Sequence, residues 1–103
     1  DLASQNAAID LVLFDSDPTG TTFTDNAALD IADADLPKVV GVVPILGADY
    51  AAFLDNSVAT KSGLGLAFNL AGTTSLFACL VARGTPTYVS TSDLKLRLAL
   101  RGN

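Results

Sequence analysis

Histidine, tryptophan and methionine are absent from this sequence, and cysteine occurs once, at Cys79. Histidine is the side chain that exchanges protons most readily near neutral pH. Without it these residues offer no serine–histidine or cysteine–histidine nucleophile and none of the common zinc sites. A single cysteine excludes an internal disulfide and a multi-cysteine metal site. The apolar run around Cys79, residues 75–82, predicts a buried, unreactive thiol.

Charge is also scarce, and it is unevenly distributed. Only 17% of the residues are charged, the net charge is −5 and the pI is near 4.2. Most of the acidic residues lie between Asp10 and Asp55, and four of the six basic residues lie between Arg83 and Arg101. Nucleic-acid affinity depends on basic side chains that neutralise phosphates, so nucleic acid and anionic membrane are poor partners for this chain. The asymmetry also leaves open a pairing of one copy's acidic part with another copy's basic part.

No apolar run approaches the roughly 18 residues that cross a bilayer, and no signal-peptide layout is present. What the sequence does contain is a high apolar fraction, 50% of 103 residues. That composition lies outside the disordered class and predicts one domain over residues 1–103. It also predicts a homo-oligomer. Because the first residue is Asp1 rather than methionine, we treat the N-terminus as a cut end, which leaves open a missing N-terminal portion.

The hydrophobic pattern is that of short strands. Residues 93–101 alternate strictly, with leucines at 94, 96, 98 and 100 and mostly basic residues between them, which predicts a strand with one buried face. Further strands are predicted at residues 9–15, 39–45, 64–70 and 76–83, with a hairpin connection at 71–74 and short extended pieces at 21–24 and 29–31. Gly41 predicts a bulge or a close approach inside its strand.

One short helical turn is predicted at residues 33–38, capped by Asp33 and ended by Pro37. Residues 48–53 fit either a helical turn or an extended stretch. Seven or eight short strands with turn residues between them are typical of a β-sandwich or a barrel. The predicted fold class is therefore all-β, a single-domain antiparallel β-sandwich. The absence of long amphipathic patterns gives no support to parallel βαβ units.

One acidic motif imitates catalytic chemistry. Residues 11–19 read as an apolar strand followed by Asp-Ser-Asp-Pro-Thr, similar to the haloacid-dehalogenase phosphatase motif. That resemblance implies Asp15 as a nucleophile and Asp17 as an acid/base beside magnesium. Pro18 stands where that motif usually has glycine, no parallel sheet is predicted, and 103 residues are too few for that fold. The favoured interpretation is a turn whose carboxylates bond the local backbone, and we expect no enzymatic activity.

The same carboxylates could also bind calcium together with Asp25, Asp30, Asp33 and Asp35, but the spacing of a calcium loop is missing. We therefore expect solvated acids, with no metal and no cofactor. Aromatic residues remain as candidates for a protein interface, because they dominate binding hot spots. We name Tyr50, Phe53 and Leu54 as interface candidates, with Tyr88 also considered. Ordinary core packing is an equal alternative for the aromatic residues.

Several long stretches resemble a family of small proteins encoded among the head genes of tailed bacteriophages. The resemblance is most specific in the run from Thr22 to Val43 and in Arg83-Gly-Thr-Pro-Thr-Tyr88. It continues through the other matching stretches, at residues 5–18, 49–52, 56–61 and 92–94. Together these stretches span nearly the whole chain.

The resemblance implies a capsid decoration (cement) protein with a jelly-roll-like β-sandwich. It implies a location on the outer capsid surface of the virion, binding to the major capsid protein, often as a dimer or trimer. The alternatives are another phage structural component, such as a head fibre, head–tail or tail protein, and, much further behind, a magnesium-dependent phosphatase. A carbohydrate-binding module is poorly supported because the chain has no tryptophan and two tyrosines.

Overall fold

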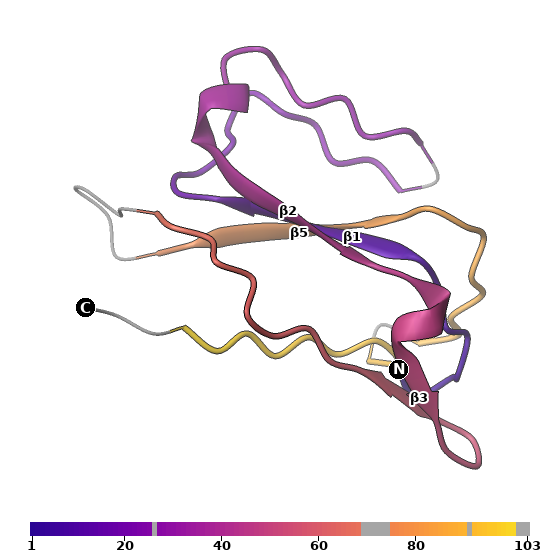
Figure 1. Ribbon diagram of the computed structural model, residues 1–103. Helices are drawn as coiled ribbons and strands as arrows, with labels where there is room; N and C mark the ends of the chain where they lie inside the picture. The colour runs from indigo at the N-terminus through magenta and orange to yellow at the C-terminus, as the bar shows by residue number, and fades with distance from the viewer. Residues whose placement is uncertain (26, 69–74, 91, 101–103) are drawn as a thin grey trace.

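The fold is organised around one central apolar strand. The computed structural model describes residues 1–25, 27–68, 75–90 and 92–100. Within them the chain forms five strands and two 3-10 turns (Figure 1). In chain order they are β1 (Ile9–Phe14), η1 (Leu36–Lys38), β2 (Val39–Ile45), η2 (Gly47–Asp49), β3 (Tyr50–Ala52), β4 (Ser57–Ala59) and β5 (Phe77–Ala82). The all-β prediction is confirmed.

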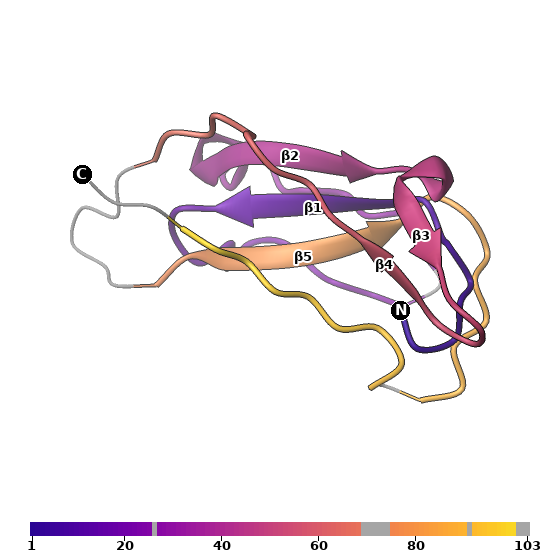
Figure 2. The same cartoon turned by 60° about the horizontal axis from the view of Figure 1, so that its bottom comes forward.

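The strands form two antiparallel sheets. A three-stranded sheet has the order β2-β1-β5, as Figure 2 shows, and a two-stranded sheet pairs β3 with β4. In the larger sheet Leu11 lies opposite Val43 on β2 and opposite Leu80 on β5. The pairing of β1 with β5 is continuous, whereas the pairing with β2 shifts register between Leu13 and Phe14. Strand β1 is therefore paired along both edges.

Both faces of β1 are covered, which explains why its sequence is apolar rather than alternating. Leu11 and Leu13 point to one face, and Val12 and Phe14 point to the other; all four are at most 4% exposed. Figure 1 shows non-strand segments on both sides of the sheet, the violet segment that follows β1 above it and the C-terminal segment below it. The core is thus a sheet enclosed by irregular chain.

The face that carries Leu11 and Leu13 holds the main apolar cluster. Val43 completes its buried centre, and partly buried side chains pack against it from Val40, Leu66 and Leu76. Leu66 lies over Gly41. A Cβ atom added to Gly41 would stand 2.7 Å from the Cδ2 atom of Leu66. The prediction of a close approach at Gly41 is confirmed, and so is a register irregularity beside it.

The helical turn predicted at 33–38 is confirmed in a shorter form, as η1. It begins with Asp35 at the N-cap position rather than Asp33, and no side chain caps it. For residues 48–53 the sequence left a helical turn or an extended stretch open. The structure contains both, because η2 is followed directly by β3. Pro37 stands in the first turn of η1, where its missing N–H costs nothing.

The predicted strand count was too high. Residues 21–24, 29–31, 64–68 and 95–100 form no strand, and the connection predicted at 71–74 lies outside the described residues. The alternating C-terminal segment is the clearest correction: Leu96 is 47% exposed and Leu100 59%. Alternation predicts which side chains share a face, but a strand also needs a neighbouring strand to bond its backbone groups.

Candidate protein interface

The candidate residues named from the sequence meet in the β3–β4 hairpin. Tyr50 pairs with Ala59, and Ala51 pairs with Val58. The turn is closed by the Phe53 N–H, which donates to the Asn56 carbonyl at 2.7 Å. In Figure 1 this hairpin projects beyond the three-stranded sheet, below the end of β2. A short hairpin of this kind needs support from the rest of the fold.

The hairpin presents an apolar surface at its tip. Phe53 is 62% exposed, Leu54 is fully exposed and Val58 on β4 is 54% exposed. We call these three residues the hairpin tip patch. Single exposed apolar residues are common, but two large ones in a closed turn, with a third on the adjoining strand, form a contiguous apolar projection. Such a projection favours contact with another protein.

Tyr50 has a different role from Phe53 and Leu54. It is half-buried at the base of the hairpin, and its hydroxyl donates to the Ala7 carbonyl at 2.9 Å. Burial, followed by the nearby Asp49 carboxylate, raises the pKa of Tyr50 above its usual value. Tyr88 is likewise half-buried and bonds the Asp1 carboxylate at 3.2 Å. Both tyrosines therefore hydrogen-bond the N-terminal segment, and neither is part of the hairpin tip patch.

Polar contacts hold the start of the hairpin in place. The Asp49 carboxylate accepts the Leu46 N–H at 2.7 Å and pairs with the Lys61 ammonium at 2.8 Å. The Lys61 hydrogen bond, and then the Leu46 N–H, hold the pKa of Asp49 below its usual value. On the other strand, the Ser57 N–H donates to the Asp1 carbonyl at 2.8 Å. The tip is thus presented from an anchored base.

The phosphatase-like residues lie in the turn that follows β1. Asp15 is half-buried and accepts from the Ser16 hydroxyl at 3.3 Å, while Asp17 is exposed and its main-chain carbonyl accepts the Thr19 N–H at 2.9 Å. Both sheets of the described part are antiparallel, so the parallel strand end on which such a site depends is not there. The segment is a turn, as predicted, but the backbone bond at Asp17 is made by its main-chain carbonyl and not by its carboxylate.

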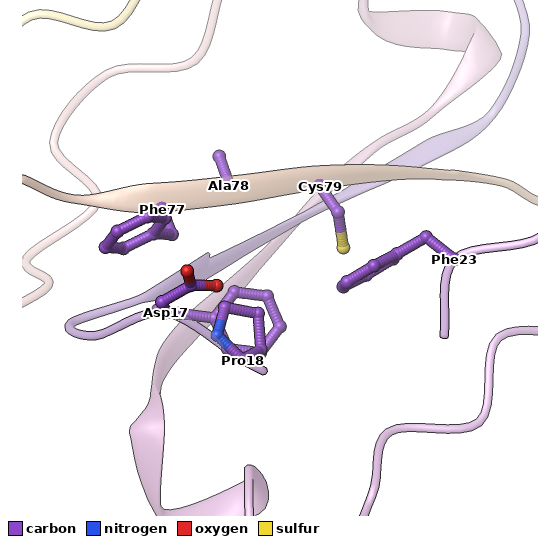
Figure 3. Close-up of a pocket in the computed structure, with 7 residues that line it drawn as sticks. Asp17, Pro18, Phe23, Phe77, Ala78 and Cys79 are labelled. Atoms are coloured by element: carbon purple, nitrogen blue, oxygen red, sulfur yellow. The ribbon is translucent and has the colours of Figure 1, made fainter. Parts of the chain in front are cut away.

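A shallow hollow of about 190 Å³ lies next to this turn, on the face of the sheet that carries Phe14. Figure 3 shows Asp17 and Pro18 on one side of it, Phe23 on another, and Phe77 and Cys79 from β5. Its lining is apolar apart from the Asp17 carboxylate and the thiol.

Cys79 is half-buried in that lining rather than fully buried as predicted. Burial raises the pKa of the Cys79 thiol above its usual value, so the thiol stays protonated near neutral pH. A protonated thiol is a weak nucleophile and a poor metal ligand.

The acidic residues considered for calcium do not gather into a site. Among the described residues no group of three or more acidic or cysteine side chains is placed to hold a metal ion. Asp35 is buried instead, with 1% of its surface exposed. It accepts from the Thr21 hydroxyl at 2.7 Å and pairs with the Lys38 ammonium at 2.7 Å. The Lys38 and Thr21 hydrogen bonds hold the pKa of Asp35 below its ordinary value of 3.8.

We expect Asp35→Asn to lower the melting temperature at pH 7 by about 5 °C or more, because Lys38 and Thr21 lose a shared charged acceptor. The folded pKa of Asp35 is lowered, so its contribution is fully present above pH 3.8 and is lost as the pH falls through the folded value. Melting followed by circular dichroism between pH 2 and 7 measures both effects. The exposed Asp33→Asn is the matched control, and equal melting temperatures for the two variants would contradict the assignment.

Comparison with protein-family models, with curated proteins and with solved structures finds no match to this chain. No helix in the described ranges is long and apolar enough to cross a membrane.

Two exposed apolar features were not predicted from the sequence. Val58 was not singled out in the sequence, and Leu80, which is 41% exposed, lies in the apolar run that predicted a buried thiol. For Val58 the position follows from the pairing with Ala51 across the short hairpin, which the sequence alone does not specify. For Leu80 the sequence gives no signal, because the edge position of β5 arises from the sheet order.

Proposed function

We propose that this chain is a capsid decoration (cement) protein. It binds the outer surface of a major capsid protein lattice in a virion and stabilises the shell, and it acts by adhesion rather than by catalysis. The resemblance to the phage head family supports the location. We further propose that the two antiparallel sheets belong to a jelly-roll-like sandwich.

The observation that carries the adhesive role is the surface of the isolated chain. Its accessible area is 7258 Å², whereas a folded monomer of 10.5 kDa exposes roughly 5,400 Å². The excess of about 1,800 Å² is comparable to what one partner loses in a large, stable interface. The chain is also flattened, with extents of 44 × 34 × 20 Å. A flat body with surplus surface and with exposed large apolar side chains, such as Leu54 and Val89, is suited to lie on other subunits.

The physical requirements of cementing match these features. A decoration protein bridges shell subunits that internal pressure separates, and contacts to two or three subunits reinforce each other through effective concentration. The hairpin tip patch offers an anchored apolar contact, and tip residues of this kind act as binding anchors when a partner pocket receives them. The net charge of −5 keeps the protein from competing for packaged nucleic acid.

The test uses particles of the parent phage with and without this chain. We expect density for the chain on the outer lattice, across subunit boundaries, in a cryo-EM map of complete particles. We also expect particles that lack it to release their nucleic acid at a lower temperature in a dye-access melt, with full recovery when the purified chain is added back. Density only at the tail, or equal release temperatures, would replace this proposal with another phage structural role.

A further inference from the structure

The three-stranded sheet has two outer edges, formed by β2 and β5. An outer strand carries backbone N–H and C=O groups that point away from the sheet, and these are ready to pair with another strand. One hydrogen bond just beyond the end of β5 shows which of its backbone N–H and C=O groups face β1 and which face outward. The Arg83 N–H donates to the Ala8 carbonyl at 2.8 Å, so this opposed pair is hydrogen-bonded.

Hydrogen-bonded and non-bonded pairs alternate along an antiparallel ladder. Counting along β5 from the Arg83–Ala8 pair, the hydrogen-bonded residues are Val81, Cys79 and Phe77. The backbone N–H and C=O groups of the residues between them point away from β1. Those outward residues are Ala78, Leu80 and Ala82, all exposed. Within the described ranges, no backbone group of another segment bonds any of these three.

The β2 edge is protected in a way that the β5 edge is not. On β2 the residues opposite Leu11 and Leu13 bond β1, so Val42 and Pro44 occupy outward positions. Pro44 has no N–H to offer there, and the register shift beside Gly41 distorts the strand. Proline and bulges are devices by which native sheets prevent edge pairing. The outer edge of β2 is therefore unsuited to a further strand.

Strand β5 carries none of these devices. Its six residues, Phe-Ala-Cys-Leu-Val-Ala, include no charge and no proline, and its register with β1 is uninterrupted. Its side chains are small or apolar, so nothing on the strand opposes the approach of another strand. An uncharged, regular edge of this kind is self-complementary, because the same groups that donate and accept on one copy accept and donate on a second.

We propose that β5 pairs with β5 of a second copy of this chain, antiparallel about a two-fold axis, to give a continuous six-stranded sheet. A two-fold axis perpendicular to the sheet keeps each face on its own side, so residues that meet must share a face. Centring the axis on Leu80 places Leu80 opposite its own copy and Ala78 opposite Ala82. In this register every outward backbone group of β5 bonds across the axis.

The pairing also buries surface that the isolated chain leaves in water. Leu80 is 41% exposed, and in the dimer it packs against Leu80 of the second copy on the face that carries Leu11 and Leu13. The surplus area of about 1,800 Å² exceeds the roughly 800 Å² that each partner loses in a standard interface. The pairing uses only residues of this chain, so we expect the dimer to form in solution without a capsid.

Light scattering on the purified chain gives the first test. We expect a mass of twice 10.5 kDa for the wild type. Leu80→Pro removes an outward N–H without removing a bond to β1, as Pro44 does on β2, and we expect it to be monomeric. Val42→Pro, the same substitution at an outward position of the opposite edge, should stay dimeric. A monomeric or trimeric wild type, or a dimeric Leu80→Pro, would overturn the proposal.

A second pair of variants covers the case in which Leu80→Pro fails to fold, as judged by far-UV circular dichroism. Leu80→Lys keeps the amide but sets two like charges opposite each other, and it should be monomeric; Val42→Lys should be dimeric. Residue-level hydrogen exchange gives an independent readout. The amides of Ala78 and Ala82 should exchange about tenfold or more slower in the wild type than in Leu80→Lys. Equal exchange would show that the edge is open and would refute the pairing.

Discussion

Replacement of Phe14 by alanine should cost about 3–5 kcal/mol of unfolding free energy. Phe14 is fully buried at the end of β1, where it lies opposite Phe77 of β5 and lines the hollow beside Pro18. Removing its ring leaves a cavity that the paired backbone on both sides cannot close. Because a domain of this size has only about 5–15 kcal/mol in total, the variant should be close to unfolded at 37 °C.

Urea unfolding followed by circular dichroism measures this change. Phe23→Ala is the matched control, since Phe23 lines the same hollow but is 50% exposed. We expect that variant to lose less than about 1 kcal/mol, because its ring contributes little to the buried core. Similar losses for the two variants would mean that the hollow, rather than the buried face of β1, sets the stability of the sheet.

The second large effect concerns attachment to the particle. The double variant Phe53→Ser, Leu54→Ser removes most of the hairpin tip patch, and we expect its affinity for stripped particles to fall roughly 100-fold, which is about 3 kcal/mol in total. The folding stability should be unchanged, because Leu54 is fully exposed and the turn is closed by the Phe53 backbone. Co-sedimentation of the labelled chain with particles measures the affinity.

Leu36→Ser serves as the control for this experiment. Leu36 is 52% exposed in η1, which precedes β2, whereas the hairpin follows it. It therefore tests whether any exposed apolar side chain has the same effect. Wild-type attachment by the double variant would show that the particle contact lies elsewhere on the chain. A loss as large for Leu36→Ser would show that attachment depends on general hydrophobicity and not on the tip.

The experiments distinguish the β5–β5 dimer from the contact between the hairpin tip patch and the particle. The β5 edge lies on the three-stranded sheet, and the tip lies on the two-stranded sheet. Variants at the tip should leave the mass in solution unchanged, and Leu80→Lys should leave a single copy able to touch the shell, although more weakly because bivalent attachment is lost. The experiments can therefore refute the dimer without refuting the capsid role, and they can refute the capsid role without refuting the dimer.

The sequence by itself determined the class of the fold and its central elements. The apolar runs predicted β1, β2 and β5 within one or two residues, and Pro37 with the acids before it predicted η1, because period and turn chemistry are properties of neighbouring residues. Gly41 was identified correctly for the same reason. Phe53 and Leu54, which were named as interface candidates, are exposed at the tip of a hairpin that was not predicted.

Only the tertiary structure decided which elements find partners. Tyr50 and Phe53 are three residues apart, yet one bonds the Ala7 carbonyl and the other lies in solvent, because the distant N-terminal segment reaches only the first. The C-terminal leucines have a strand pattern without a strand, and Leu80 is exposed because β5 ends the sheet. Strand pairing joins residues far apart in the chain, and no local pattern specifies that choice.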